Sequence, residues 1–162
     1  MATLHNRINK RVLKQALLSQ PQNRLTLSFY CYHYIPDPGT FRNQLYLTFS
    51  NLDVLGRIYV AKEGINAQIS VPQDNLDKFR DALYSIHFLN GIRLNIAIED
   101  DGKSFFALKI QVKKKIVADG LNDETFDVTN AGKHLSAAEF NELTSKPDTL
   151  VIDMRNHYES EV

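Results

Sequence analysis

The chain has 162 residues, of which 43% are apolar, so it can bury one good core and hold a domain of about 100 residues with part of a second. This length argues against two complete domains. Lys plus Arg number 19, as do Asp plus Glu, and this balance excludes a global field that would draw the whole molecule to a polyanion, so any nucleic-acid contact must come from a local arrangement of charge.

The first fifty residues predict a helix, a strand and a second helix. Apolar residues recur at helical spacing in a basic stretch that ends at Pro21, which predicts a short amphipathic helix within a lead-in over residues 1–24: Ile8, Val12, Ala16 and Leu17. Strict alternation from Leu25 to Ile35 predicts a long strand. Its apolar face carries Leu25, Leu27, Phe29, Cys31, His33 and Ile35, and its other face carries Thr26, Ser28, Tyr30, Tyr32 and Tyr34. Asp37 followed by Pro38 predicts the N-cap and first turn of the next helix, whose apolar positions are Phe41, Leu45, Phe49 and Leu52.

The next stretch predicts a hairpin, a helix and two further strands. Val54 to Ala61 and Ile65 to Val71 indicate two strands joined at Glu63-Gly64. Pro72 ends the second of them, Asp74 is the predicted cap of a helix, and an Asn90-Gly91 turn follows that helix. The buried stripe of the helix is Leu76, Phe79, Leu83 and Ile86. A fourth strand carries Leu94, Ile96 and Ile98, and an Asp101-Gly102 turn sends the chain back into a fifth, roughly Phe105 to Lys113.

The order strand, helix, strand, strand, helix, strand is the split βαβ pattern of the ferredoxin-like fold. We therefore predict an α+β domain over residues 25–117, with two helices packed on one sheet face and the other face uncovered. By the same alternation, the uncovered face is polar and aromatic. Its members are Tyr30, Tyr32, Tyr34, Arg57, Tyr59, Asn66, Gln68, Ser70, Arg93 and Asn95.

Tyrosine rings on such a face can stack on unpaired bases while Arg57 and Arg93 contact phosphate, which favours single-stranded RNA as a partner. A cluster of lysines could extend the basic track: Lys109, Lys113, Lys114 and Lys115. Two alternatives remain open. Another part of the protein could cover the tyrosines, and a lysine-rich strand end is also an ordinary solubilising and edge-protecting device.

The residues after the fifth strand indicate a linker and the start of another fold. Residues 118–132 are predicted to connect the parts, because the acidic stretch within them has no apolar period. Over residues 133–162, the capping box Ser136 to Glu139 predicts a small helix, and Leu150 to Ile152 predict a short strand. One helix and one strand cannot bury a core, so we expect this second domain to be incomplete and its apolar strand to be partly unsheltered.

Few residues point to chemistry within the chain itself. The five histidines include no pair at metal-ligand spacing, so the sequence predicts no metal site and shows no flavin motif. Cys31 lies on the apolar face of its strand and is predicted to be a core residue, not a nucleophile. A single cysteine fits a reducing compartment, and no apolar run approaches membrane-spanning length, so we expect a cytoplasmic protein without membrane contact.

Several long, collinear segments resemble one bacterial family. They are Leu4-His-Asn-Arg-Ile8, Phe29-Tyr30, Gly56-Arg-Ile-Tyr-Val60, Glu63-Gly-Ile-Asn-Ala-Gln-Ile-Ser70, Leu94-Asn-Ile-Ala97, Asp100-Asp-Gly-Lys-Ser-Phe105, Ile116-Val-Ala-Asp-Gly120 and Ile152-Asp-Met-Arg-Asn-His-Tyr-Glu159. Over essentially the whole chain these segments are similar to the rhodanese-related tRNA uridine hydroxylase family. The resemblance implies an acylphosphatase-like domain, then a rhodanese domain. It also implies tRNA as partner, and oxygen-dependent conversion of the wobble uridine to 5-hydroxyuridine with molecular oxygen as co-substrate.

The resemblance also bears on individual residues. Asp153, Arg155 and Glu159 match the opening of rhodanese domains, where they imply a structural role at the strand end. The implied catalytic cysteine belongs to a loop beyond Val162, and Cys31 does not match it, so a polypeptide ending here is expected to be inactive alone. A rhodanese-type sulfurtransferase and a non-catalytic packing domain remain as alternatives. Oligomeric state, the choice of tRNA and the way in which oxygen is activated do not follow from the sequence.

Overall fold

The computed structural model describes residues 4–5, 8–19, 23–97, 104–117, 127, 130 and 132–153. The chain forms two compact units, Met1–Thr129 and Asn130–Val162. Among the described residues, the first unit contains the sheet and three α-helices, and the second contains one helix. The domain limits inferred from the sequence stay a prediction.

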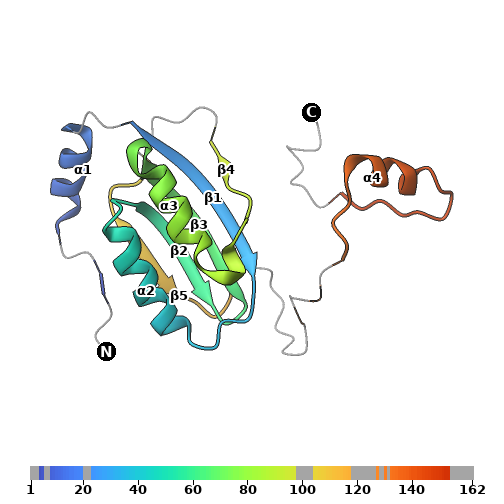
Figure 1. Cartoon of the computed structure of the whole chain (residues 1–162), viewed down its shortest axis with the longest axis horizontal. Helices are drawn as coiled ribbons and strands as arrows, with labels where there is room; N and C mark the ends of the chain where they lie inside the picture. The colour runs from blue at the N-terminus through green and yellow to red at the C-terminus, as the bar shows by residue number, and fades with distance from the viewer. Residues whose placement is uncertain are drawn as a thin grey trace. The chain divides into compact units, whose positions relative to one another are not determined.

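The first unit follows the predicted order of elements. The helices and strands are α1 (Lys10–Ser19), β1 (Arg24–Tyr32), α2 (Pro38–Ser50), β2 (Leu55–Ala61), β3 (Gly64–Pro72), α3 (Leu76–Tyr84), β4 (Asn95–Ile96) and β5 (Leu108–Val112). Two short 3-10 turns flank α3, at Gln73–Asn75 and His87–Leu89. Helices α2 and α3 lie on one face of the sheet, as Figure 1 shows, so the predicted α+β, ferredoxin-like arrangement is confirmed.

The five strands have the order β4-β1-β3-β2-β5. Strand β1 is antiparallel to β3 and β4, and β2 is antiparallel to β3. The prediction that a tight turn returns the fifth strand beside the fourth is wrong, because β5 lies at the opposite edge and runs parallel to β2. A two-residue turn can join only neighbouring antiparallel strands. Asp101 and Gly102 themselves lie outside the described residues.

Both edge strands are shorter than predicted. Strand β4 has two residues and β5 has five, and each lies at an edge of the sheet. Ile96 is opposite Leu27 in the register and therefore faces the helices, yet 48% of it is exposed at the sheet edge. Ile98 lies outside the described residues. The fourth strand thus contributes little to the core.

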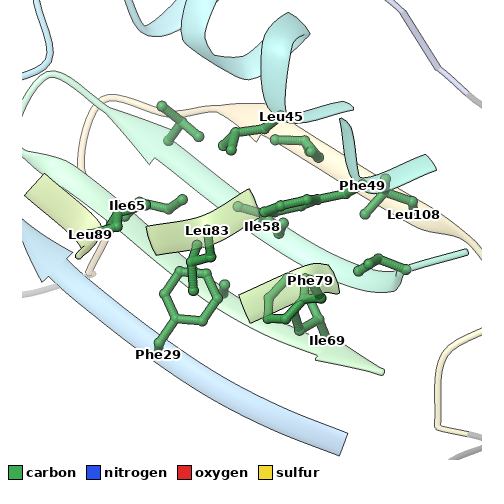
Figure 2. Packing of buried hydrophobic residues seen from close by; sticks show 14 of the residues in the cluster. Phe29, Leu45, Phe49, Ile58, Ile65, Ile69, Phe79, Leu83, Leu89 and Leu108 are labelled. Atoms are coloured by element: carbon green, nitrogen blue, oxygen red, sulfur yellow. The ribbon is translucent and has the colours of Figure 1, made fainter. Parts of the chain in front are cut away.

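The core lies between the sheet and the two helices (Figure 2). Alternate residues of β3, Ile65, Ala67, Ile69 and Val71, are fully buried, as the sequence pattern predicted. Phe49 of α2 and Phe79 of α3 meet over them with ring centroids 5.2 Å apart. Each such ring contributes about 1.5–3 kcal/mol when fully buried. This packing fixes which sheet face is covered.

Three local predictions differ in outcome. Asp37 caps α2, since its carboxylate accepts the Thr40 N–H at 3.0 Å and Pro38 occupies the first turn. Asp74 does not cap α3, because the chain first makes a 3-10 turn and Asn75 takes the N-cap position. The predicted N-terminal helix forms as α1, but Leu17 is its buried residue, whereas Ile8 and Val12 are exposed.

The second unit confirms one predicted element and contradicts another. Helix α4 (Ala137–Thr144) begins with the predicted capping box between Ser136 and Glu139. Leu150, Val151 and Ile152 do not form the predicted strand, and they are 83%, 55% and 68% exposed. A strand requires a hydrogen-bonding neighbour, and the described part of this unit offers none. The expected exposure of these three residues is confirmed.

Candidate nucleic-acid interface

The uncovered sheet face is built from cross-strand rows of side chains. The pairing register aligns one polar row across all five strands: Asn95, Ser28, Gln68, Arg57 and Lys109. A neighbouring row joins four strands: Tyr30, Asn66, Tyr59 and Gln111. We call these two rows, with Tyr32, the open face. The face exists because every second residue of each strand points away from α2 and α3.

Two tyrosines of β1 are exposed to solvent. Tyr30 is 59% exposed and Tyr32 37% exposed, and their rings meet edge to face with centroids 6.2 Å apart. Tyr34, 62% exposed, follows the end of the strand. Tyr59 on β2 is half-buried. Exposed rings two residues apart on one strand give successive platforms on which bases can stack.

The charges of the open face have one sign. The described strands contain Arg24, Arg57 and Lys109 but no Asp or Glu. Arg57 is exposed and stacks over Phe105, with its guanidinium carbon 5.9 Å from the ring centroid. Lys113 lies with Nζ 5.4 Å from the Tyr59 ring centroid. Cations placed among aromatic rings, with no carboxylate on the same strands, favour an anionic aromatic ligand.

The other cations predicted for this face lie outside the strands. Lys114 is exposed and Lys115 is half-buried, both in the segment that follows β5. Arg93 is exposed but precedes β4, so the pairing register does not assign it to the open face. The structure therefore brings together the tyrosines, Arg57 and Lys109, and leaves Arg93 apart from these rows.

One end of the open face is closed by a residue that the sequence reasoning missed. Ser70 was predicted to be accessible but is fully buried, because the Arg24 side chain lies on it. Arg24 Nε donates to Ser70 Oγ at 3.0 Å, and its Nη2 donates to the carbonyls of Ser70 and Asp53. Burial lowers the pKa of Arg24, although the charge of Asp53 opposes that shift. The sequence held one sign of this contact: Arg24 directly precedes the alternation that begins at Leu25, on the same parity as the residues of the open face.

A second buried arginine ties the edge of the sheet together. Arg42 of α2 donates from Nε to the Ile110 carbonyl at 2.9 Å, from Nη1 to Asn43 Oδ1 at 2.7 Å, and from Nη2 to the Leu4 carbonyl. Burial lowers its pKa, and Tyr46 opposes the shift. All three nitrogens are engaged in holding α2, β5 and the N-terminal segment together, so Arg42 is a structural residue.

Two cavities lie beside β5. One of about 650 Å³ is bordered by His5, Ile8, Arg42, Arg57 and Phe105, and one of about 600 Å³ lies at the start of α2, bordered by Asp37, Thr40 and Lys113. Neither is bordered by the tyrosines of β1.

The surroundings of Cys31 favour its neutral thiol over the thiolate. Cys31 is half-buried with Sγ 3.6 Å from the Phe88 carbonyl, and burial raises the pKa of its thiol. Among the residues described, no three His, Cys, Asp or Glu side chains gather closely enough to hold a metal ion. None of the helices described is long and apolar enough to cross a membrane. Asp153 is exposed, while Arg155 and Glu159 lie outside the described residues.

Comparison with known proteins agrees with this architecture. The family model described as the UPF0176 acylphosphatase like domain matches residues 24–116, which include all five strands, α2 and α3. Over 163 aligned residues the chain is 53% identical to a protein of Photorhabdus laumondii, 54% to one of Escherichia fergusonii and 53% to one of Cronobacter sakazakii. Each of these relatives carries the name tRNA uridine(34) hydroxylase.

The matches include 100% of this chain but 46%, 47% and 47% of the three relatives, so the chain spans about half the length of the curated relatives it matches. The resemblance drawn from the sequence segments is thereby confirmed. With more than half of its length matched by the family model, the chain belongs to the family of the UPF0176 acylphosphatase like domain.

Proposed function

We propose that this chain is part of a protein that hydroxylates uridine 34 of tRNA, and that its acylphosphatase-like domain holds the RNA on the open face. The first half of the proposal rests on the name shared by relatives about 53% identical to the whole chain. The second half rests on the chemistry of the face itself. In this account the protein acts in the cytoplasm, where tRNA is found.

The observation that carries the RNA-binding role is the pairing of exposed rings with cations on described strands that contain no Asp or Glu. Tyr30 offers its ring to solvent in the row next to that of Arg57 and Lys109. An unpaired base stacked on an aromatic ring contributes about 1–3 kcal/mol. The cations supply the phosphate contacts, each of which releases counterions when the RNA binds. A duplex would present no base faces to these rings, so the loop of a tRNA fits better than its stems.

The chemical step is assigned to residues outside this part of the protein. Cys31 has a raised pKa and a half-buried sulfur, so it is a poor nucleophile at neutral pH. In our proposal the reaction uses molecular oxygen, and the cysteine expected in a rhodanese domain provides the reactive group. The domain described here binds and orients the substrate.

The test is a titration of unmodified tRNA into the chain and into a Tyr30→Ala/Arg57→Ala variant. Loss of one stacked ring and one phosphate contact is expected to weaken binding by at least about tenfold. A matched control, Lys78→Ala/Arg80→Ala, removes two cations from α3 on the opposite sheet face and should bind as the wild type does. Equal affinity for the wild type and the Tyr30→Ala/Arg57→Ala variant would refute the RNA-binding role and make this face a packing surface.

A further inference from the structure

The chain does not leave the sheet where β5 ends. Strand β5 is an edge strand, and its last pair joins Val112 to Val60 of β2. The Lys113 N–H continues this pairing, donating to the Val60 carbonyl at 2.8 Å. Three residues later, at Ile116, the backbone is bonded by residues of the β2–β3 hairpin. The chain has therefore turned inward and crossed β2 to reach β3.

Two side chains hold Ile116 at both of its backbone polar groups. The Ile116 N–H donates to Glu63 Oε1 at 2.7 Å, and Asn66 Nδ2 donates to the Ile116 carbonyl at 3.2 Å. The Ile116 side chain is only 3% exposed. A main-chain amide bonded to a carboxylate is a charge-assisted contact, stronger than a neutral one. We call Glu63 and Asn66 the hairpin clamp.

The clamp sets where the lysines after β5 lie. Asn66 stands in the row between Tyr30 and Tyr59, with its side chain on the open face. A segment bonded to Asn66 must lie over that face, which accounts for the half-buried state of Asn66 and Tyr59. Lys113 accordingly rests on the Tyr59 ring, and Lys114 is exposed beside it.

We propose that the hairpin clamp on Ile116 positions Lys113 and Lys114 as a cationic rim of the open face, and that this rim binds the phosphates of an unpaired RNA segment whose bases stack on Tyr30. The inference rests on the proposed RNA-binding function and adds its positioning residues. Glu63 and Asn66 do not touch the RNA in this account. They act by fixing a flexible basic segment in advance, so that less conformational freedom is lost when RNA binds.

The experiment uses the full chain and two probes, a 12-nucleotide oligouridine and an unmodified tRNA transcript, each titrated over a salt series. The clamp variant is Glu63→Ala/Asn66→Ala. For single strands, each phosphate contact contributes about 0.7 to the slope of log affinity against log salt, which corresponds to about fivefold in affinity at 0.1 M salt. We expect the clamp variant to lose one or two such contacts, with a smaller slope and about five- to twenty-fivefold weaker binding.

A structural role alone would not produce the coupling that we expect with the lysines. Lys113→Ala/Lys114→Ala should weaken binding in the wild-type background and have little effect in the clamp variant, since the rim is then already lost. The single variant Glu63→Gln keeps an oxygen acceptor for the Ile116 N–H and leaves Asn66 in place. It should therefore retain most of the wild-type salt slope. Hydrogen exchange should show the Ile116 amide protected in the wild type and exposed in the clamp variant, with β1 and β3 protected in both.

The outcomes separate this inference from the function on which it rests. If the wild type binds RNA and the clamp variant binds with the same slope, or if the lysine substitutions weaken binding equally in both backgrounds, the clamp inference is overturned and the RNA-binding face remains. Continued protection of Ile116 in the clamp variant also overturns it. If the wild type binds neither probe, the proposed function fails first, and the role given to the rim fails with it.

Discussion

Replacing Gly64 by alanine should destabilise the first unit much more than the same replacement at Gly91. Gly64 opens β3 and pairs with Tyr32, with a φ of 148°. A Cβ atom there would lie 2.1 Å from the Cys31 carbonyl oxygen and 3.0 Å from the Tyr32 Cα. Gly91, with a φ of 74°, has no atom within 4 Å of the corresponding Cβ position. The pair therefore separates backbone strain from steric conflict.

The expected magnitudes follow from these two terms. A left-handed conformation costs a non-glycine residue about 1–2 kcal/mol, and that is the whole cost expected for Gly91→Ala. At Gly64 the added carbon meets backbone atoms, which cannot rotate away as a side chain can. The β1–β3 pairing must open locally, and losing one or two ladder hydrogen bonds adds about 1–3 kcal/mol. We expect Gly64→Ala to cost about 3 kcal/mol or more in total.

The assay is urea unfolding of both variants and the wild type, followed by far-UV circular dichroism at 25 °C. Equal m-values would show that the same surface unfolds in each protein. We expect the urea midpoint to fall much further for Gly64→Ala than for Gly91→Ala. Equal losses of unfolding free energy would refute it, because the close approach of β1 to Gly64 would then have no energetic consequence.

Three other predictions concern buried and titrating groups. Arg42→Met should lower the unfolding free energy by about 1–3 kcal/mol, measured by urea unfolding, because the buried Ile110 carbonyl loses its donor; no loss would contradict a structural role. Burial raises the pKa of Cys31, so at pH 8 iodoacetamide should alkylate the folded chain more slowly than the urea-unfolded chain. The contribution of Cys31 to stability should decline as the pH rises above the pKa of the unfolded thiol. The pKa of Glu139 is lowered from 4.5 to about 2, first by Lys133 and then by Ser136, so its support of α4 is present above pH 4.5 and is lost as the pH falls towards 2. A carboxyl NMR titration with a midpoint near 4.5 would contradict this last prediction.

The sheet face that the helices cover could be predicted from the sequence, because the alternation of apolar residues along each strand specifies it. A strand with one buried face must alternate, and Ile65, Ala67 and Ile69 do so without exception. Asp37 before Pro38 also has a local cause, since a carboxylate and a ring with fixed φ suit the first turn of a helix. Signals of this kind lie within a few residues of the element that they specify.

The remaining features depend on residues far apart in the sequence. The place of β5 beside β2 is a choice of partner, and alternation within Leu108–Val112 does not reveal which edge accepts it. The Arg24 side chain donates a hydrogen bond to Ser70, 46 positions away. This contact buries a residue that alternation alone places in solvent. Leu150 to Ile152 have strand-like composition, but composition cannot supply a pairing neighbour.

In the candidate interface, too, local features could be predicted from the sequence and contacts between distant residues could not. Alternation correctly predicted that Tyr30 and Tyr32 share an exposed face. It could not show that the run from Lys113 to Ile116 folds back over that face, because the contacts responsible come from Glu63 and Asn66, 53 and 50 positions away. Side-chain bonds to a distant main chain leave no periodic signal in the sequence.

The central claim is that the open face binds unpaired RNA, and an NMR footprint tests it most directly. Titrating an unmodified tRNA anticodon stem-loop into the isotopically labelled chain should shift the ring resonances of Tyr30 and the amide resonances around Arg57 and Lys109. Residues of α2 and α3 that face solvent should remain unchanged. Shifts confined to those helices, or no shifts at all, would contradict the account.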